Sequence, residues 1–442
     1  MSAQIEEIPL EDLNPWRQNA RTHSRKQIAQ IARSIERFGF TNPVLIDEKN
    51  NILAGHGRVR AAAGLGMETV PCLRFNHMSA AEKQAYVIAD NKLALNAGWD
   101  KETLAIELQA LVDLDFDMEL TGFSMSEIDL VIEEAHDSAA DGREAPEDDI
   151  PPLQDKAVAR KGDRWLLGRH RLVCGDARNR ADYDLLLKGE EANLIFTDPP
   201  YNVAIDGNVC GKGRIRHREF AMASGEMTEE AYTAFLGECL GAAAGVCSDG
   251  AIAFVCMDWR HMGELLAAGK PVFSELKNVC VWNKSNAGMG SFYRSKHELV
   301  FAFKVGTGPH INNFGLGKSG RHRSNVWDYP GGSSFGSERD AALAMHPTVK
   351  PAALVGDAIR DCSKRGQIVL DPFGGSGTTL IAAAKTGRAA RLIEYDALYC
   401  DTIIRRFETY TGKPALLAST GETFEDVAID RNEAHAGEPH DA

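Results

Sequence analysis

The glycine-rich segment at residues 371–379 constrains the fold more than any other part of the sequence. It reads Asp-Pro-Phe-Gly-Gly-Ser-Gly-Thr-Thr, follows the apolar run 368–370 and precedes a helical stretch at 380–385. Glycines there permit a tight turn, and the N-terminus of the following helix offers unpaired N–H groups. Glu394 ends the next apolar run twenty residues after Gly374, an offset suited to accepting hydrogen bonds from ribose hydroxyls. The segment predicts an adenosine-type cofactor site, and the alternative is a glycine-rich turn in an unrelated strand–helix unit.

Apolar runs in the C-terminal part of the chain alternate with helical stretches. Four of them are short and bounded by turn residues, at 194–197, 251–255, 368–371 and 391–394. Near-continuous apolar strands with intervening helices are typical of a parallel sheet that is covered on both faces. Two further runs, 279–282 and 299–303, favour an added antiparallel pair. We therefore expect an α/β fold with a Rossmann-like sheet and an added antiparallel strand pair.

An acidic, proline-rich segment at 144–152 is the clearest domain boundary. Its composition indicates a linker, and a chain of 442 residues has room for two or three domains. We expect a smaller α+β domain with a helical extension over 1–132, a linker over 133–157, the α/β domain over 158–415 and an acidic tail over 416–442. Within the first domain, apolar spacing predicts helices at 27–38, 58–65 and 80–95 and strands at 43–47, 52–54 and 70–73.

The net charge of −14 lies in two segments. Residues 133–155 carry nine acids and one base, and residues 421–442 carry seven acids and one base. We expect both segments to be solvated and poorly ordered. The rest of the chain is neutral on balance, so local basic patches for phosphate binding are compatible with the composition.

Composition also argues against several classes of protein. The chain has no run of eighteen apolar residues, which argues against a membrane-spanning helix, and its first residues lack the pattern of a secretory signal. The nine cysteines form no Cys-x-x-Cys pair, which argues against a zinc ribbon and a disulfide framework. We therefore expect a cytoplasmic protein with free thiols that binds no membrane and no metal.

A second motif, Asp198-Pro199-Pro200-Tyr201, directly follows the apolar run 194–197. Its two prolines hold the backbone extended and remove two N–H donors, so that carbonyl groups are left facing outward. Asp198 and such a carbonyl form an acceptor pair suited to a planar –NH2 group, and Tyr201 offers a face for ring stacking. The motif predicts a clamp for the amino group of a nucleobase, and the alternative is a plain Pro-Pro turn at a strand end.

These two motifs, with His-Pro-Thr-Val-Lys-Pro at 346–351 between them, resemble the amino-DNA methyltransferase family over roughly residues 160–412. The catalytic motif precedes the cofactor motif, as in the permuted beta group of that family. The resemblance implies a methyltransferase sheet and S-adenosylmethionine as the cofactor.

The resemblance also implies which residues hold the cofactor. The loop 373–378 would hold its methionine end, Glu394 its ribose, and Asp176 would lie near its adenine. The expected cofactor-binding set is Asp176, Lys350, Pro351, Asp371, Phe373, Gly374, Gly375, Ser376, Gly377, Thr378 and Glu394.

The expected mechanism follows from the residue types in the clamp. An exocyclic amine is a poor nucleophile because its lone pair is delocalised into the ring. Hydrogen bonds to Asp198 and the Pro199 carbonyl favour a pyramidal nitrogen that attacks the sulfonium methyl directly, without a metal. A stacked base is out of reach, so the target must be flipped out of double-stranded DNA and stacked on Tyr201. The expected catalytic set is Asp198, Pro199, Pro200 and Tyr201.

The sequence leaves more than one target base and more than one reaction open. The resemblance favours N6 of adenine, because Asp rather than Ser opens the motif at Asp198. The alternatives are N4 of cytosine, a DNA-binding regulatory protein with an idle methyltransferase half, and methylation of RNA or protein. The sequence leaves open the recognition site, membership of a restriction-modification system and a homodimeric state.

Two basic segments flank the proposed site in sequence. Residues 283–323 carry seven Lys or Arg and one acid, and residues 212–218 carry four bases. Both suit loops that contact DNA, with a solvated surface as the alternative. We expect target recognition over 305–345. The expected DNA-binding residues are Lys212, Arg214, Arg216, Arg218, Lys284, Arg294, Lys318, Arg321 and Arg323.

The N-terminal part resembles the ParB/sulfiredoxin-type domain over roughly residues 5–100, at Leu-Asn-Pro 13–15, Gly55-His56-Gly57-Arg58 and Ile-Ala-Asp-Asn-Lys 88–92. In that family a Gly-x-x-Arg turn at a helix start binds nucleotide phosphates. Gly57 and Ala94 stand where ParB proteins usually carry Arg, which argues against nucleotide hydrolysis. A nucleotide-binding switch and a DNA- or protein-docking module both remain open, and no helix-turn-helix is predicted after this domain.

Replacing Arg214, Arg216 and Arg218 together by Ala tests the assignment of these side chains to phosphates. Lost phosphate contacts weaken binding alike on every sequence, because phosphates carry no sequence information. Fluorescence anisotropy on several unrelated duplexes measures this. A changed recognition sequence would contradict the assignment.

Overall fold

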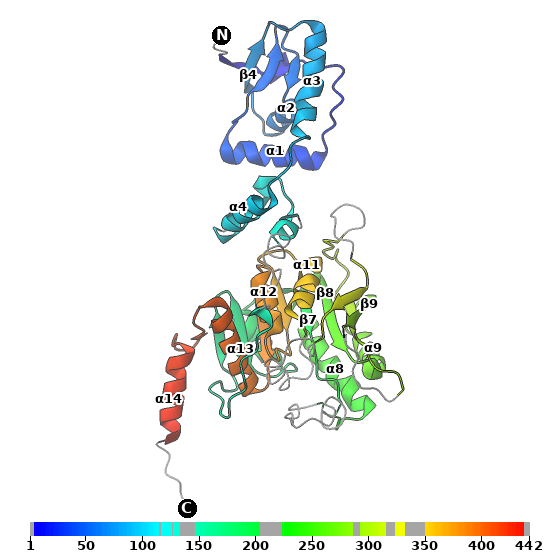
Figure 1. Cartoon of the computed structure of the whole chain (residues 1–442), viewed down its shortest axis with the longest axis vertical. Helices are drawn as coiled ribbons and strands as arrows, with labels where there is room; N and C mark the ends of the chain where they lie inside the picture. The colour runs from blue at the N-terminus through cyan, green and yellow to red at the C-terminus, as the bar shows by residue number, and fades with distance from the viewer. Residues whose placement is uncertain are drawn as a thin grey trace, which may run out of the picture. The chain divides into compact units, whose positions relative to one another are not determined.

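The computed structural model describes residues 4–114, 116–125, 127–132, 146–203, 223, 225–285, 292–314, 323–331 and 350–436. The chain folds as two units, Met1–Asp141 and Gly142–Ala442, each with hydrophobic cores of its own (Figure 1). No helix of the described residues is long and apolar enough to cross a membrane.

A four-stranded mixed sheet in the order β1-β4-β2-β3 forms the first unit. Its strands are β1 (Ile5–Pro9), β2 (Val44–Asp47), β3 (Ile52–Ala54) and β4 (Thr69–Phe75), and its helices are α1 (Arg25–Phe38), α2 (His56–Gly64) and α3 (Ala80–Ala94). All helices and strands predicted for this domain are present. Strand β1 was not predicted, because its two isoleucines lie three residues apart rather than two.

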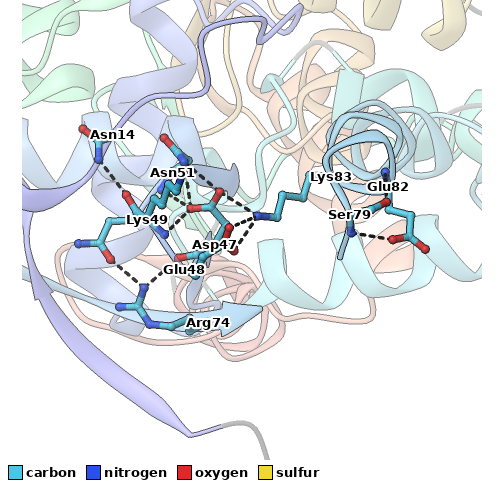
Figure 2. Close-up of polar contacts among 10 residues, drawn as sticks. Asn14, Asp47, Glu48, Lys49, Asn51, Arg74, Ser79, Glu82 and Lys83 are labelled. Carbon is cyan, nitrogen blue, oxygen red and sulfur yellow. Dashed lines mark hydrogen bonds and ion pairs between the residues drawn. The ribbon is translucent and has the colours of Figure 1, made fainter. Parts of the chain in front are cut away.

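A buried carboxylate ties helix α3 to this sheet. Asp47 ends β2, and its Oδ1 accepts hydrogen bonds from the backbone N–H groups of Lys49 and Asn51 at 2.9 and 2.8 Å. Its Oδ2 lies 3.2 Å from the Lys83 ammonium on α3, and its backbone carbonyl accepts from Arg74 on β4 at 2.8 Å (Figure 2). The β2–β3 turn, the central strand and the helix are thereby fixed to one another.

A separate small core follows in the same unit. Helix α4 (Lys101–Asp113), the 3-10 turn η2 (Met118–Thr121) and helical residues 127–132 pack around Leu108, Met118, Ile128 and Ile132. Arg33 on α1 forms an ion pair with Glu119 of η2. These three short helical pieces correspond to the helical extension expected from the sequence.

A ten-stranded sheet in the order β11-β9-β10-β8-β7-β12-β13-β6-β5-β14 forms the second unit. Its strands are β5 (Arg164–Leu167), β6 (His170–Cys174), β7 (Ala192–Thr197), β8 (Cys247–Met257), β9 (Glu275–Lys284), β10 (His297–Lys304), β11 (Val326–Tyr329), β12 (Ile368–Asp371), β13 (Ala389–Glu394) and β14 (Leu416–Leu417). The five strands from β8 to β6 are parallel, and β10 pairs antiparallel with both β8 and β9. The predicted α/β fold with an added antiparallel pair is confirmed.

Helices cover both faces of this sheet (Figure 1). One face packs against α11 (Ala352–Cys362), α12 (Thr378–Lys385) and α13 (Ala397–Thr411), and the other against α6 (Arg180–Leu187), α8 (Glu229–Ala244) and α9 (Met262–Gly269). Side chains of β8 alternate between the two layers, with Phe254 in the first and Val255 in the second. Because both faces are buried there, β8 is apolar from residue 251 to residue 257, which is the pattern seen in the sequence.

The expectation that the two acidic segments are poorly ordered is wrong where the structure describes them. Residues 146–159 lie along the second unit, where the Arg406 guanidinium donates to the Glu147 carbonyl at 2.7 Å. The C-terminal segment forms β14 and the helix α14 (Phe424–Ala436), and Arg431 on this helix pairs with Asp163 at 2.5 Å. Segment composition did not reveal these contacts, because Arg406 and Asp163, the partners of the two segments, lie elsewhere in the chain.

We expect Asp401→Asn to destabilise the second unit by about 2–4 kcal/mol. Asp401 is fully buried, and its carboxylate accepts from the backbone N–H groups of Val158 and Ala159 at 2.7 and 2.8 Å. Asparagine can accept only one of these bonds and turns an amide against the other donor. Urea unfolding measures the change, with the exposed Asp155→Asn as the control. Equal stability of the two variants would contradict a structural role for Asp401.

Candidate active site

The two sequence motifs meet at one edge of the large sheet. Strands β7 and β12 are parallel neighbours, so residues 198–201 and 372–378 both leave from their carboxyl ends. The chain proceeds from β7 to β8 in one direction and from β12 to β13 in the other. The β7–β12 pair is therefore the topological switch point of the sheet, the place where open α/β sheets bind ligands.

Asp198 lies at the centre of a buried charge network. Its Oδ2 accepts from the Lys350 ammonium at 2.6 Å, and its Oδ1 accepts from the Tyr201 hydroxyl at 2.6 Å. Lys350 also lies 3.0 Å from Glu298 Oε2, and Lys284 pairs with the other oxygen of Glu298. Two lysines and two carboxylates thus balance one another beside the tyrosine ring.

The network keeps its charges despite burial. Burial disfavours the ammonium form of Lys350, but Asp198 and Glu298 outweigh it and raise the pKa of Lys350. Burial likewise opposes ionisation of Glu298, but Lys350 and Lys284 lower its pKa to about 2. Burial raises the pKa of Asp198, and the Lys350 ammonium offsets part of that rise. Removing Lys350 would leave Asp198 without a cationic partner, whereas Glu298 would still be paired with Lys284.

A second buried carboxyl joins this network to the glycine-rich loop. Asp371 Oδ1 accepts from the Thr197 hydroxyl at 2.9 Å and from the Phe373 N–H at 3.1 Å, and Oδ2 accepts from the Thr379 hydroxyl at 2.6 Å. Thr197 directly precedes Asp198. The Asp371 side chain therefore fixes the start of both the Asp-Pro-Pro-Tyr motif and the glycine-rich loop. Burial raises the pKa of Asp371 to about 7.

The glycine-rich loop needs its glycines for space and for backbone angle. A Cβ on Gly374 would lie 3.1 Å from Ile403 Cδ1, and Gly377, with φ +85°, begins α12. Gly375 N–H donates to Glu394 Oε2 at 2.8 Å, and Arg406 holds the Ser376 carbonyl at 2.9 Å. The loop therefore runs closely over β13 and α13.

Three expected cofactor residues have other partners in this structure. Glu394 also accepts from the Asp396 N–H at 2.8 Å, and burial raises the pKa of Glu394 to about 7. Asp176 pairs with Arg178 at 2.7 Å. Lys350 donates to Asp198, although the resemblance places it among the cofactor-binding residues. Pro351 precedes α11 as its N-cap residue.

The clamp prolines lie where the sequence predicts them, directly after β7. The Pro200 carbonyl accepts from the Tyr232 hydroxyl on α8 at 2.7 Å. This bond fixes the peptide group between Pro200 and Tyr201 and leaves the direction of the Pro199 carbonyl to the extended backbone.

The expected DNA-binding residues divide into three groups. Lys212, Arg214, Arg216, Arg218, Lys318 and Arg321 lie outside the described residues, as does much of the segment 305–345. Arg323 pairs with Asp357 at 3.0 Å and Asp361 at 3.1 Å, so its charge serves the protein itself and we remove it from the proposed DNA contacts. Lys284 belongs to the Glu298 network, and Arg294 lies between β9 and β10.

The Gly-x-x-Arg turn of the first unit lies at a helix start, as predicted. Gly55, with φ +104°, precedes α2, and the Arg58 guanidinium folds over it to donate to the Asn42 carbonyl at 2.6 Å. His56 Nε2 accepts from the Trp16 N–H at 3.1 Å. Gly57 is buried beside His23, where a Cβ would lie 3.1 Å from the imidazole.

Sequence reasoning did not assign roles to Glu298, Thr197 and Tyr232. A signal for Glu298 exists, because it is a carboxylate within the otherwise apolar run of β10 and an acid there needs a partner. Thr197 and Tyr232 have no comparable signal, because hydroxyl groups at a strand end and on a helix are common.

Three family models match separate parts of this chain. The model described as DNA methylase, of the N6 and N4 type, matches residues 192–405. The ParB N-terminal domain matches residues 1–91, and the ParB-methyltransferase HTH domain matches residues 102–161. The chain belongs to the DNA methylases and carries an N-terminal ParB domain. It is accordingly a DNA methyltransferase of the N6/N4 family.

The HTH match overturns the expectation that no helix-turn-helix follows the ParB domain. The matched region includes most of α4, η2 and the helical residues 127–132. These helices are short and share a core of four fully buried side chains, so their apolar period in the sequence is weak.

Individual proteins resemble the N-terminal and the C-terminal part of this methyltransferase. The ParB-like nuclease domain-containing protein YnaK of Escherichia coli (strain K12) is 54% identical over 76 residues, which are 17% of this chain and 87% of that protein. The type II methyltransferase M2.MboI of Moraxella bovis is 24% identical over 240 residues, 53% of this chain and 86% of that protein. The solved PvuII DNA methyltransferase (cytosine-N4-specific) is 17% identical, with 65% of this chain and 97% of that chain covered and a TM-score of 0.42.

We expect Asp371→Asn to gain stability relative to the unchanged protein as the pH rises from about 4 to about 7. The folded protein holds a proton on Asp371 up to its pKa of about 7, whereas the unfolded chain releases it near the ordinary value of 3.8. Stability of the unchanged protein is therefore lost across this window, by up to a few kcal/mol, and asparagine does not titrate. Urea unfolding at pH 5 and pH 8 measures the difference. If the difference in unfolding free energy between Asp371→Asn and the unchanged protein were the same at pH 5 and pH 8, Asp371 would not titrate in this range.

Proposed function

We propose that this methyltransferase transfers a methyl group from S-adenosylmethionine to the N6 amine of an adenine that is flipped out of double-stranded DNA. The observation that carries the proposal is the Asp198 carboxylate, held by Lys350 and Tyr201 directly beside the glycine-rich loop. The contact through Asp371 and Thr197 supports the proposal, because it holds residues 198–201 and the glycine-rich loop together at one switch point.

The residues of the loop fit this cofactor. Gly374 and Gly377 let the loop lie tightly against Ile403, where a Cβ on either would crowd that side chain. The acid at Glu394 ends the next strand, where a carboxylate can accept from ribose hydroxyls. We assign the methionine end to 373–378 and the adenine side to the neighbourhood of Asp176. When bound, S-adenosylmethionine supplies a methyl group on a sulfonium.

The clamp orients the target amine. Lys350 retains Asp198 Oδ2, so we assign the amine to Oδ1, the oxygen now bonded by the Tyr201 hydroxyl, and to the Pro199 carbonyl. Two acceptors favour a pyramidal nitrogen with an available lone pair. The amine nitrogen must lose a proton after it forms its new bond, and Asp198 is placed to take it. Burial makes Asp198 a better base by raising its pKa.

Adenine is the proposed target, with N4 of cytosine as the alternative. The proposal rests on the acid that opens the motif at Asp198, by resemblance to the adenine-specific type. The matched family covers both N6 and N4 chemistry, and both amines have the same hydrogens to offer the clamp.

The ParB and HTH regions support a DNA-docking role for the first unit in the same proposal. A domain described as ParB-methyltransferase HTH gives a reason for this unit to accompany a methyltransferase. The Arg58 side chain, engaged with backbone carbonyls, favours docking over a nucleotide-dependent switch.

The test is methyl transfer from labelled S-adenosylmethionine to unmethylated genomic DNA, followed by mass spectrometry of the nucleosides. We expect N6-methyladenine, and Asp198→Ala to lower the rate at least about a hundredfold, as loss of a preorganised polar group does. Glu229→Ala, on the exposed first turn of α8, serves as the control that retains activity.

The other outcomes separate the alternatives. N4-methylcytosine would keep the clamp and overturn the base assignment. No methylated base, despite measurable cofactor binding, would favour the regulatory protein with an idle methyltransferase half.

A further inference from the structure

Two aromatic side chains in the connection between β9 and β10 have large solvent-exposed fractions. Phe292 and Tyr293 are 89% and 82% exposed, the highest values among the large apolar side chains of the described residues. Their rings lie against each other with centroids 4.7 Å apart at an angle of 69°. Exposure of two adjacent rings costs free energy, so it calls for a partner that covers them.

The connection that carries these rings begins and ends at the charge network. It joins β9, which ends at Lys284, to β10, which begins at His297. The Lys284 N–H donates to the Lys296 carbonyl at 2.9 Å, so the two ends of the connection are pinned together. Lys284 and Glu298 both belong to the network around Asp198.

The length of the connection keeps the rings close to the charge network. Phe292 lies four residues before Lys296, so it is at most about 14 Å from that pinned end. The DNA grooves are about 8 Å deep. A duplex whose target base entered the clamp would therefore pass within about the length of this connection.

The charge around the rings matches the same partner. Residues 285–296 contain Arg294 and Lys296, both just after the rings, and no acid. Basic side chains next to an apolar pair suit a wedge, in which phosphates are held while a ring enters between base steps. A protein partner would need no such excess of positive charge.

We propose that Phe292 and Tyr293 form a wedge that enters the duplex and fills the space left by the flipped target base. The rings would stack on the neighbouring bases and so offset part of the stacking that flipping removes. This inference rests on the proposed function, because it requires a double-stranded DNA substrate and an extruded base.

The experiment compares two duplexes that contain the recognised site, identified beforehand from the sequence context of methylated genomic DNA. In one the target base is fully paired, and in the other an abasic site lies opposite it, which lowers the cost of flipping. We expect Phe292→Ala with Tyr293→Ala to lower the methylation rate at least about tenfold on the paired duplex and less than about threefold on the abasic duplex.

A ring-retaining variant provides the matched control. Phe292→Tyr with Tyr293→Phe exchanges the two rings and should keep near-normal rates on both duplexes. Cofactor affinity and the urea midpoint of the alanine variant should equal those of the unchanged protein, since the two side chains contribute little to its core.

Three results would overturn the wedge. They are an equal loss on both duplexes, no loss on either, and a loss in the ring-retaining variant that matches the alanine variant. Failure of the proposed function is distinguishable, because then the unchanged protein would methylate neither duplex.

Discussion

The ion pair between Lys350 and Asp198 is the interaction on which the rest of the site depends. Its two atoms lie 2.6 Å apart, and its two residues are 152 positions apart in the chain. A buried carboxylate without this partner would take up a proton and lose its capacity to accept from an amine. The same lysine holds Glu298, which holds Lys284, so β7, β9, β10 and the start of α11 are fixed around one set of charges.

Asp371 holds the backbone of the two loops in place, as the ion pairs hold the charged side chains. It is the last residue of β12, and its three hydrogen bonds join the two loops that leave the switch point. Because it accepts from groups on both sides, a shift of the glycine-rich loop alters the position of Thr197 and hence of Asp198. Geometry at the clamp and geometry at the cofactor loop are therefore set together.

Local sequence determines much of this fold and less of the site. The parallel strands, the antiparallel β9–β10 pair and the helix after the glycine-rich loop are predictable, because each depends on apolar period or on turn residues close in sequence. The contact of Lys350 with Asp198 is not, because it depends on how distant segments meet. The order of the acidic segments was missed for the same reason. Glu147 of the first segment pairs with Lys385, and Arg431 of the second pairs with Asp163, both far along the chain.

The two edges of the ten-stranded sheet have a consequence for self-association. Strand β14, at one edge, has two residues, and β11, at the other, has four. A short edge strand presents few unpaired N–H and C=O groups to another chain, so it is a poor template for intermolecular β-pairing. The C-terminal helix α14, anchored by Arg431 on Asp163, adds cover beside β14. Growth of the sheet by pairing along β14 or β11 is therefore disfavoured.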